Sequence, residues 1–202
     1  MKRKMICAGL LLSLFVFATG CSSKTEKESN TTPEVEATVV PSNSPLPTAC
    51  VEVTQNKKNG STLTNETEGY QLNYDSNMLE VKNEKSIISF IATENNKKAQ
   101  EESNLFLSIT TTDTKTATAL GKQLKSIYKK DMKKKSVTIG AKKTDAAQYT
   151  ISKVKDLRHE FYIIAGDEKG WYIELKCPSK YEKKYSKVFD GILESLIFEE
   201  KK

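Results

Sequence analysis

The chain has little of what most catalytic sites use. Its 202 residues include a single histidine, His159, and no HExxH, CxxC, glycine-rich phosphate loop or calcium-loop spacing occurs in the sequence. A serine or cysteine triad needs a histidine base and an orienting carboxylate, whereas His159 stands between Arg158 and Glu160 as an exposed residue would. We therefore expect no enzyme activity, no cofactor and no metal; a weak divalent-cation site at Asp167 and Glu168 is the alternative.

Arginine is also scarce. Arg3 and Arg158 are the only arginines, so nearly all of the positive charge in this chain of formal net charge +6 comes from lysine. Readout of nucleic-acid grooves and clamping of phosphates depend on the planar fork of arginine. We therefore expect no nucleic-acid partner and interpret the excess of lysine as a solvated face.

Long apolar runs are missing except near the amino terminus. Residues 1–4 are basic, residues 5–18 form an apolar run, and Thr19 and Gly20 are small residues before Cys21. The run is shorter than the ~20 residues of a membrane-spanning helix, and this order of segments is typical of a secretory signal peptide. We expect residues 1–20 to be removed rather than kept as a transmembrane anchor.

The end of this leader contains a second signal. Residues 17–21 read Phe-Ala-Thr-Gly-Cys and resemble the lipobox of bacterial lipoproteins. The resemblance implies diacylglyceryl transfer to the Cys21 sulfur and cleavage between Gly20 and Cys21. Two or more acyl chains hold a protein on a bilayer, whereas one is marginal. We expect a lipid-anchored protein at the extracytoplasmic face of a cell membrane; an ordinary signal peptide, in which Cys21 has no role, is the alternative.

Proline and polar residues divide the remainder in two. Between residues 22 and 68, Ser, Thr, Asn and Pro make up 24 of 47 residues, and four of the five prolines lie here. Such a segment buries too little apolar surface to offset its ordering entropy. We expect a disordered tether over residues 21–68 and one folded domain over residues 69–202.

The domain alternates strand and helix patterns. Period-two apolar alternation predicts strands, and apolar residues at steps of three and four predict helices. The strands are expected near residues 70–74, 79–81, 87–91, 105–109, 137–139, 147–151, 161–165 and 171–177, and the helices over 117–132 and 181–196. The order ββββ-α-ββββ-α favours an α+β fold, in which an antiparallel sheet of about seven to eight strands packs with two amphipathic helices.

The outer face of the first expected helix is basic. Asp113 or Thr114 can cap its start. A lysine face of this kind could rest on anionic lipid or wall polymer, at about 1 kcal/mol for each lysine near such a surface. The lysines expected on this face are Lys122, Lys125, Lys129, Lys130, Lys133 and Lys134, and the first five form the candidate basic face.

Two thiols besides Cys21 remain after removal of the leader. An extracytoplasmic setting favours oxidation of a pair, and a bridge between Cys50 and Cys177 would close a long loop. The chain-entropy model gives such a bridge about 4–5 kcal/mol. Because Cys50 lies well before the first expected strand, two free thiols are the alternative.

Three motifs of the domain suggest a family. They are an opening strand, a late hairpin and a closing helix, at residues 69–74, 160–175 and 177–198. In these motifs the chain resembles the PsbP-like domain, the α/β sandwich of the extrinsic photosystem II protein and of many bacterial lipoproteins. The resemblance implies a sandwich fold, and it carries over no metal-binding or photosystem-binding residue.

Together these features favour a non-enzymatic binding or scaffolding module of the cell envelope. We expect a monomer, held on the membrane by its lipid, with an unidentified envelope protein as its partner. The alternative is a solute-binding lipoprotein with a pocket between sheet and helix, using Tyr149, Trp171 and Tyr172. Since these aromatic residues alternate on strands, core packing is the favoured explanation for them.

Overall fold

The computed structural model describes residues 51–56 and 60–199. Short 3-10 helices lie at Glu94–Asn96 and Lys129–Asp131. The strands and α-helices are, in chain order, β1 (Val51–Asn56), β2 (Gly60–Asn65), β3 (Tyr70–Tyr74), β4 (Leu79–Glu84), β5 (Ile87–Ala92), α1 (Lys97–Gln100), β6 (Phe106–Asp113), α2 (Thr114–Tyr128), β7 (Met132–Ile139), β8 (Thr144–Ile151), β9 (Leu157–Ala165), β10 (Lys169–Pro178), α3 (Ser179–Ser195) and β11 (Ile197–Phe198).

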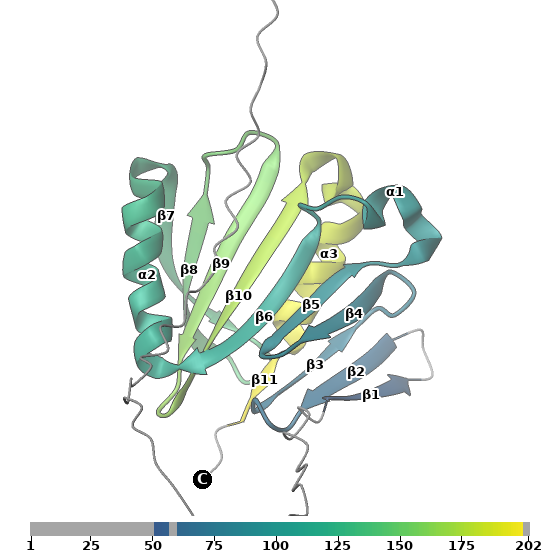
Figure 1. Cartoon of the computed structure of the whole chain (residues 1–202), viewed down its shortest axis with the longest axis horizontal. Helices are drawn as coiled ribbons and strands as arrows, with labels where there is room; N and C mark the ends of the chain where they lie inside the picture. Colours follow the sequence, from purple (N-terminus) through teal and green to yellow (C-terminus); the bar gives the residue numbers. More distant parts are fainter. Residues whose placement is uncertain (1–50, 57–59, 200–202) are drawn as a thin grey trace, which may run out of the picture. The chain divides into compact units, whose positions relative to one another are not determined.

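The strands form two antiparallel sheets (Figure 1). The larger has seven strands in the order β4-β5-β6-β10-β9-β8-β7, and the smaller has four in the order β1-β2-β3-β11. Strand β10 pairs with β6 on one side and with β9 on the other, which joins the early and late strands of the chain. The predicted α+β class with antiparallel strands is confirmed, but the strands are shared between two sheets instead of one.

The folded part begins earlier than the sequence pattern predicts. Strands β1 and β2 fall within the segment expected to be a disordered tether, and β2 pairs with β3. Only Leu63 brings a large apolar side chain from β2 into the core, and its inward neighbours Ser61 and Asn65 are buried polar residues. The predicted boundary at residue 68 is therefore wrong, because β2 is a strand with almost no hydrophobic signal.

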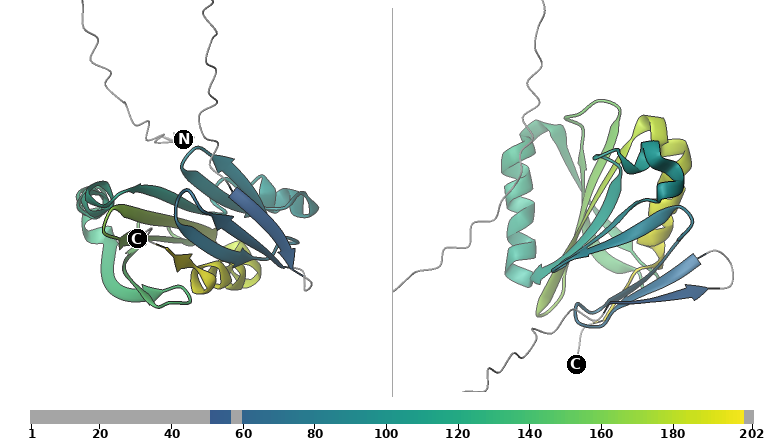
Figure 2. Two further views of the ribbon diagram at one scale, coloured as in Figure 1. Left: turned by 90° about the horizontal axis from the view of Figure 1, so that it is seen from below. Right: turned by 45° about the vertical axis from the view of Figure 1, so that its right-hand side comes forward.

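The seven-stranded sheet is covered differently on its two faces (Figure 2). On one face, here the α3 face, α3 and the four-stranded sheet enclose the main core, which includes Phe90, Trp171 and Phe189. On the other, the α2 face, α2 packs on a smaller cluster from β8 and β9. The buried residues of this cluster are Ala117, Leu124, Tyr149, Ile151, Phe161 and Ile163.

Helix α2 ends before its predicted end at residue 132. Its start is capped as expected, because the Asp113 carboxylate accepts a hydrogen bond from the backbone N–H of Thr116 at 2.9 Å. Its last helical residue is Tyr128, since Lys129 has a left-handed φ of 47° and the chain turns into β7 at Met132. The lysines that follow Met132 therefore lie on an edge strand of the sheet and not on the helix.

Candidate functional site

A cleft of about 850 Å³ lies between α2 and the strands β7, β8 and β9. Its helix wall carries Lys122 and Lys125, with Lys129 at the end of the helix. Its strand wall includes Lys134 on β7 and Asp145 on β8. The neighbouring elements α2 and β7 thus bring basic side chains to one concave site.

Small side chains keep this cleft open beside a closely packed helix. Gly121 faces β8, and a Cβ atom at this position would lie only 2.4 Å from the Tyr149 hydroxyl oxygen. The floor next to it is lined by Ala147 and Ala165, whose side chains fill little space. The glycine therefore lets α2 approach Tyr149, while the alanines leave room between the helix and the edge of the sheet.

The cleft has an excess of positive charge. Lys122, Lys125, Lys129 and Lys134 line it together with one carboxylate, Asp145. Across residues 51–56 and 60–199, none of these lysines forms an ion pair. The ammonium group of Lys134 lies 5.7 Å from the centroid of the Tyr149 ring, which is a cation–π distance. A concave site with unpaired charge of one sign attracts counter-ions, here anions.

The predicted basic face is divided by the structure. Lys122, Lys125 and Lys129 reach the cleft, and Lys130 is exposed outside its lining. Lys133 lies on β7 next to Lys134, and because neighbouring side chains of a strand point to opposite faces, it points away from the cleft. The expectation that Lys130 and Lys133 share one helix face with the others is thereby corrected.

The cysteine predictions fall mostly on undescribed parts of the chain. Gly20, Cys21 and Cys50 lie outside the described residues, so cleavage, lipid attachment and the Cys50–Cys177 bridge stay predictions. Cys177 is fully buried on β10 and has no disulfide partner among the described residues. Burial raises the pKa of Cys177 to about 11. Little thiolate therefore exists at neutral pH, which makes this thiol a poor nucleophile and metal ligand.

His159 is buried, which corrects the expectation of an exposed histidine. Its Nε2 lies 2.9 Å from Oε1 of Glu174, and Nζ of Lys176 lies 2.8 Å from the same oxygen. The Tyr128 ring at the end of α2 stands edge-on to the imidazole. Burial by itself would raise the pKa of Glu174, but its hydrogen bonds with His159 and Lys176 outweigh burial and lower that pKa. This cluster holds the end of α2 against β9 and β10.

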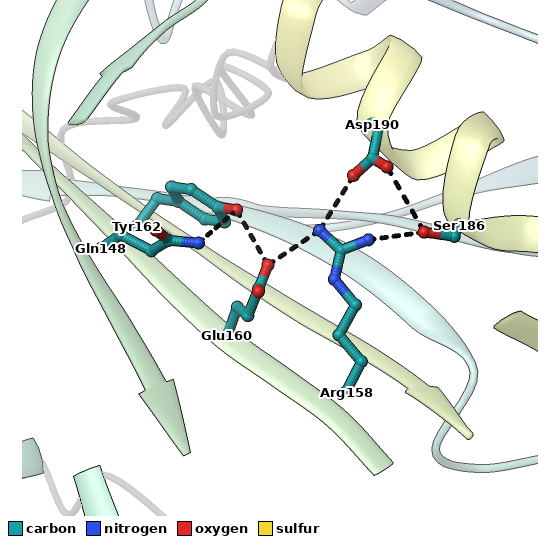
Figure 3. A network of polar contacts seen from close by, with 6 residues as sticks. All are labelled: Gln148, Arg158, Glu160, Tyr162, Ser186 and Asp190. Carbon is teal, nitrogen blue, oxygen red and sulfur yellow. Dashed lines mark hydrogen bonds and ion pairs between the residues drawn. The ribbon is translucent and has the colours of Figure 1, made fainter. Parts of the chain in front are cut away.

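The one arginine of the folded domain joins α3 to the sheet (Figure 3). Arg158 on β9 donates hydrogen bonds to Ser186 and Asp190 of α3 at 2.8 and 2.9 Å, and to Glu160 at 2.9 Å. The Tyr162 hydroxyl donates to Glu160 at 2.8 Å. Burial alone would lower the pKa of Arg158, but the bonds with Asp190 and Glu160 raise it. Because its hydrogen-bond donors are used inside the protein, we interpret Arg158 as a residue that holds α3 on the sheet and not as a ligand-binding residue.

Of the three aromatic residues considered for a ligand pocket, only Tyr149 reaches the cleft. Trp171 is 1% exposed in the main core, and its indole N–H donates to the Glu68 carbonyl at 2.9 Å. Tyr172 packs beside the small cluster under α2. The pocket between sheet and helix therefore has lysines on its walls where aromatic residues were expected.

Two other properties concern metals and membranes. Within the described ranges no group of three or more His, Cys, Asp or Glu side chains could hold a metal ion, and Asp167 and Glu168 are exposed in the turn before β10. None of the helices in the described part of the chain has the length and apolarity needed to cross a membrane.

Comparisons with known proteins add a likeness of structure only. No protein-family model and no curated protein sequence matches the chain. Among solved structures, it is similar to cyanobacterial PsbP (CyanoP) from Synechocystis sp. PCC 6803, determined in solution, with 10% identity and a TM-score of 0.45 over 72% of this chain and 97% of that chain. No site residue, ligand or partner is carried over from that protein, so the cleft is interpreted from its own chemistry.

Proposed function

We propose that this protein is a non-enzymatic binding module of the cell envelope, anchored by lipid at Cys21, that binds anionic ligands in the lysine-lined cleft. The observation that carries the proposal is the set of four cleft lysines without a carboxylate partner in the described chain. Where a lysine serves structure instead, as Lys176 does beside Glu174, it is paired.

The chemistry of lysine supports binding more than catalysis. An ammonium group is a compact, hydrated point charge that holds phosphate or carboxylate oxygens without imposing a bidentate geometry. Several such groups around a concave surface raise the local concentration of anions and speed their association. The cleft is thus suited to capture, with selectivity set by the spacing of its charges.

Anchoring at Cys21 is tested by the mass of the natively expressed protein. We expect the leader to be absent and Cys21 to carry acyl chains, and we expect a Cys21→Ser variant to leave the membrane fraction. An unmodified Cys21 thiol, or a leader still attached, would remove the membrane from the proposed function while leaving the cleft untouched.

Binding in the cleft is tested with two variants of equal charge. The cleft variant replaces Lys122, Lys125, Lys129 and Lys134 with Gln, and the control variant replaces Lys130, Lys133, Lys135 and Lys153, which lie outside the cleft lining, with Gln. Purified chains from Ser22 onward are sedimented with isolated cell-envelope fragments. We expect at least a tenfold loss of binding for the cleft variant and little change for the control; equal losses would contradict binding in the cleft.

An envelope protein partner is the second candidate, and a different surface favours it. Helix α2 leaves part of its face of the sheet uncovered, where Ile87, Ile91 and Phe106 line a hollow of about 320 Å³. Ile87 is 39% exposed there. If a protein docks on this surface, Ile87→Asp should abolish its crosslinking to the chain, whereas the cleft variant should not.

A further inference from the structure

The cleft lysines are distributed along the cleft and do not converge on one point. Lys122 and Lys125 are three residues apart, which places them on one side of α2, and Lys129, the residue directly after the helix, lines the cleft as well. With a rise of about 1.5 Å per residue, the Cα atoms of Lys122 and Lys125 are roughly 4.5 Å apart along the helix. Lys134 faces these lysines from β7 across the cleft. The site therefore presents several positive charges along one wall and a further one on the strand wall.

Between these charges the lining is partly apolar, with Thr118, Ser136 and Asp145 as its other polar residues. Its floor includes the Tyr149 ring, Ile163 and Met132. A free phosphate ion would occupy a small part of the 850 Å³ and would leave the apolar floor uncovered. A chain in which anionic groups alternate with carbon linkers covers both kinds of surface, because its charges meet the lysines while its linkers lie on the floor.

The shape of the cleft argues against a bilayer as its ligand. The cleft lies between α2 and the strands β7, β8 and β9, on the α2 face of the seven-stranded sheet. A concave site of this kind admits a strand more readily than a flat layer of headgroups.

We infer that the cleft binds one strand of a linear polyanion in which phosphodiesters alternate with short carbon linkers. The inference rests on the proposed function, since it names the ligand class of the same cleft. A phosphodiester keeps one negative charge at all physiological pH values, so each repeat offers one charge to one ammonium group. The carbon linkers between successive charges take the place of water on the apolar floor.

The experiment compares four probes by calorimetry at equal concentrations of charge. The purified chain from Ser22 onward is titrated with poly(glycerol phosphate), inorganic phosphate, phosphatidylglycerol vesicles and polyglutamate. We expect the polymer to bind at least 100-fold more tightly than inorganic phosphate and at least tenfold more tightly than the other two. If four contacts behave as in single-stranded nucleic acids, the affinity should fall about 50-fold between 50 and 200 mM salt.

Two neighbouring residues provide a matched pair. Lys134 lines the cleft, whereas Lys133 on the same strand points to the opposite face. Lys134→Gln should lower the slope of log affinity against log salt by about 0.7, the value of one contact. Lys133→Gln should leave the slope unchanged. Likewise, the cleft variant should have a smaller slope than the parent, whereas the control variant should keep the slope of the parent.

The outcomes separate the inference from the proposed function. If no probe binds, or if the cleft and control variants lose equal affinity, both are overturned. Another outcome is that inorganic phosphate or vesicles bind as tightly as the polymer, with this binding abolished in the cleft variant. In that case the inference alone is overturned, and the cleft remains a binding site for anions. Polyglutamate binding as tightly as the phosphate polymer also overturns it, because the cleft then recognises charge and not phosphodiesters.

Discussion

The two faces of the seven-stranded sheet differ in how their cationic side chains are paired. The arginine on the α3 face is paired with carboxylates, whereas the lysines around the cleft on the α2 face are not. Arg158 engages Glu160, Ser186 and Asp190 on the first face. On the second, Lys122 and Lys125 line open space without a partner in the described chain. The two faces share the same strands, so the difference lies in what covers them.

This difference separates groups that hold the fold from groups available for binding. A charge taken out of water must be paired and hydrogen-bonded, or it destabilises the protein. A lysine at the rim of an open cleft has no such requirement, since its ammonium group remains hydrated. Substitutions on the α3 face should therefore change stability, and substitutions around the cleft should change binding.

The largest expected effect tests how completely each face is closed. Phe189 of α3 is fully buried in the main core, and Leu124 of α2 lies 4% exposed beside the cleft. We expect Phe189→Ala to lower the free energy of unfolding by about 3–5 kcal/mol and Leu124→Ala by about 2–3 kcal/mol, because structure next to a cleft can relax into it. Urea denaturation measures both, and a greater loss for Leu124→Ala would contradict the comparison.

The next largest effect concerns the ion pair of Arg158, the residue that joins α3 to the sheet. Arg158→Met leaves the buried Glu160 carboxylate without its cationic partner, with the Tyr162 hydroxyl still donating to it; the Arg158 and Glu160 side chains are 19% and 12% exposed. We expect a loss of about 3 kcal/mol, typical of a broken buried pair.

The double variant Arg158→Met/Glu160→Gln is the control for this prediction. It removes the orphaned charge, and part of the stability should return, as a double-mutant cycle in urea would show. Additive losses in that cycle would mean that the two groups do not depend on each other.

Two glycines in helices allow a prediction of opposite sign for the same change. At Gly121 a new Cβ would meet the Tyr149 hydroxyl, while at Gly191 on α3 it would meet nothing within 4 Å. We expect Gly121→Ala to cost about 1–2 kcal/mol, since overpacking outweighs the gain in helix propensity. Gly191→Ala should stabilise the protein by up to about 1 kcal/mol.

Thermal denaturation distinguishes the two glycine variants by the direction of the Tm shift. Adding Tyr149→Phe to Gly121→Ala removes the atom in the way and should restore most of the loss. A Gly121→Ala variant as stable as the parent would contradict the close approach of α2 to Tyr149.

Most elements between residues 69 and 198 follow from local pattern, and the exceptions have physical causes. Apolar alternation in Tyr70–Tyr74 and in Lys169–Pro178 reports strands with buried faces directly. Gly60–Asn65 is a strand whose inward positions are Ser61, Leu63 and Asn65, so its hydropathy pattern does not predict a strand. A second sheet could not be predicted either, because periodicity describes single strands and not their partners.

The candidate site was predictable in part. Three of its lysines belong to the expected basic face, since residues at helical spacing share a side. Lys134, Asp145 and Tyr149 come from strands that meet α2 only through the pairing order β9-β8-β7. The helical spacing of apolar residues continues to Met132, so nothing in the pattern marks the turn at Lys129.

The smallest expected effect joins stability and binding in one residue. Lys129 has φ 47° and ψ −117°, a conformation that strains any side chain with a Cβ atom but suits glycine. We expect Lys129→Gly to stabilise the fold by about 1 kcal/mol while removing one charge from the cleft. Lys130→Gly, one residue further and outside the cleft lining, should instead be neutral or destabilising and leave binding intact. If the Lys129→Gly variant is more stable and binds as tightly as the parent, Lys129 does not contribute to binding in the cleft. If it is more stable but binds more weakly, the lysine at this turn contributes its charge to binding and lowers the stability of the fold.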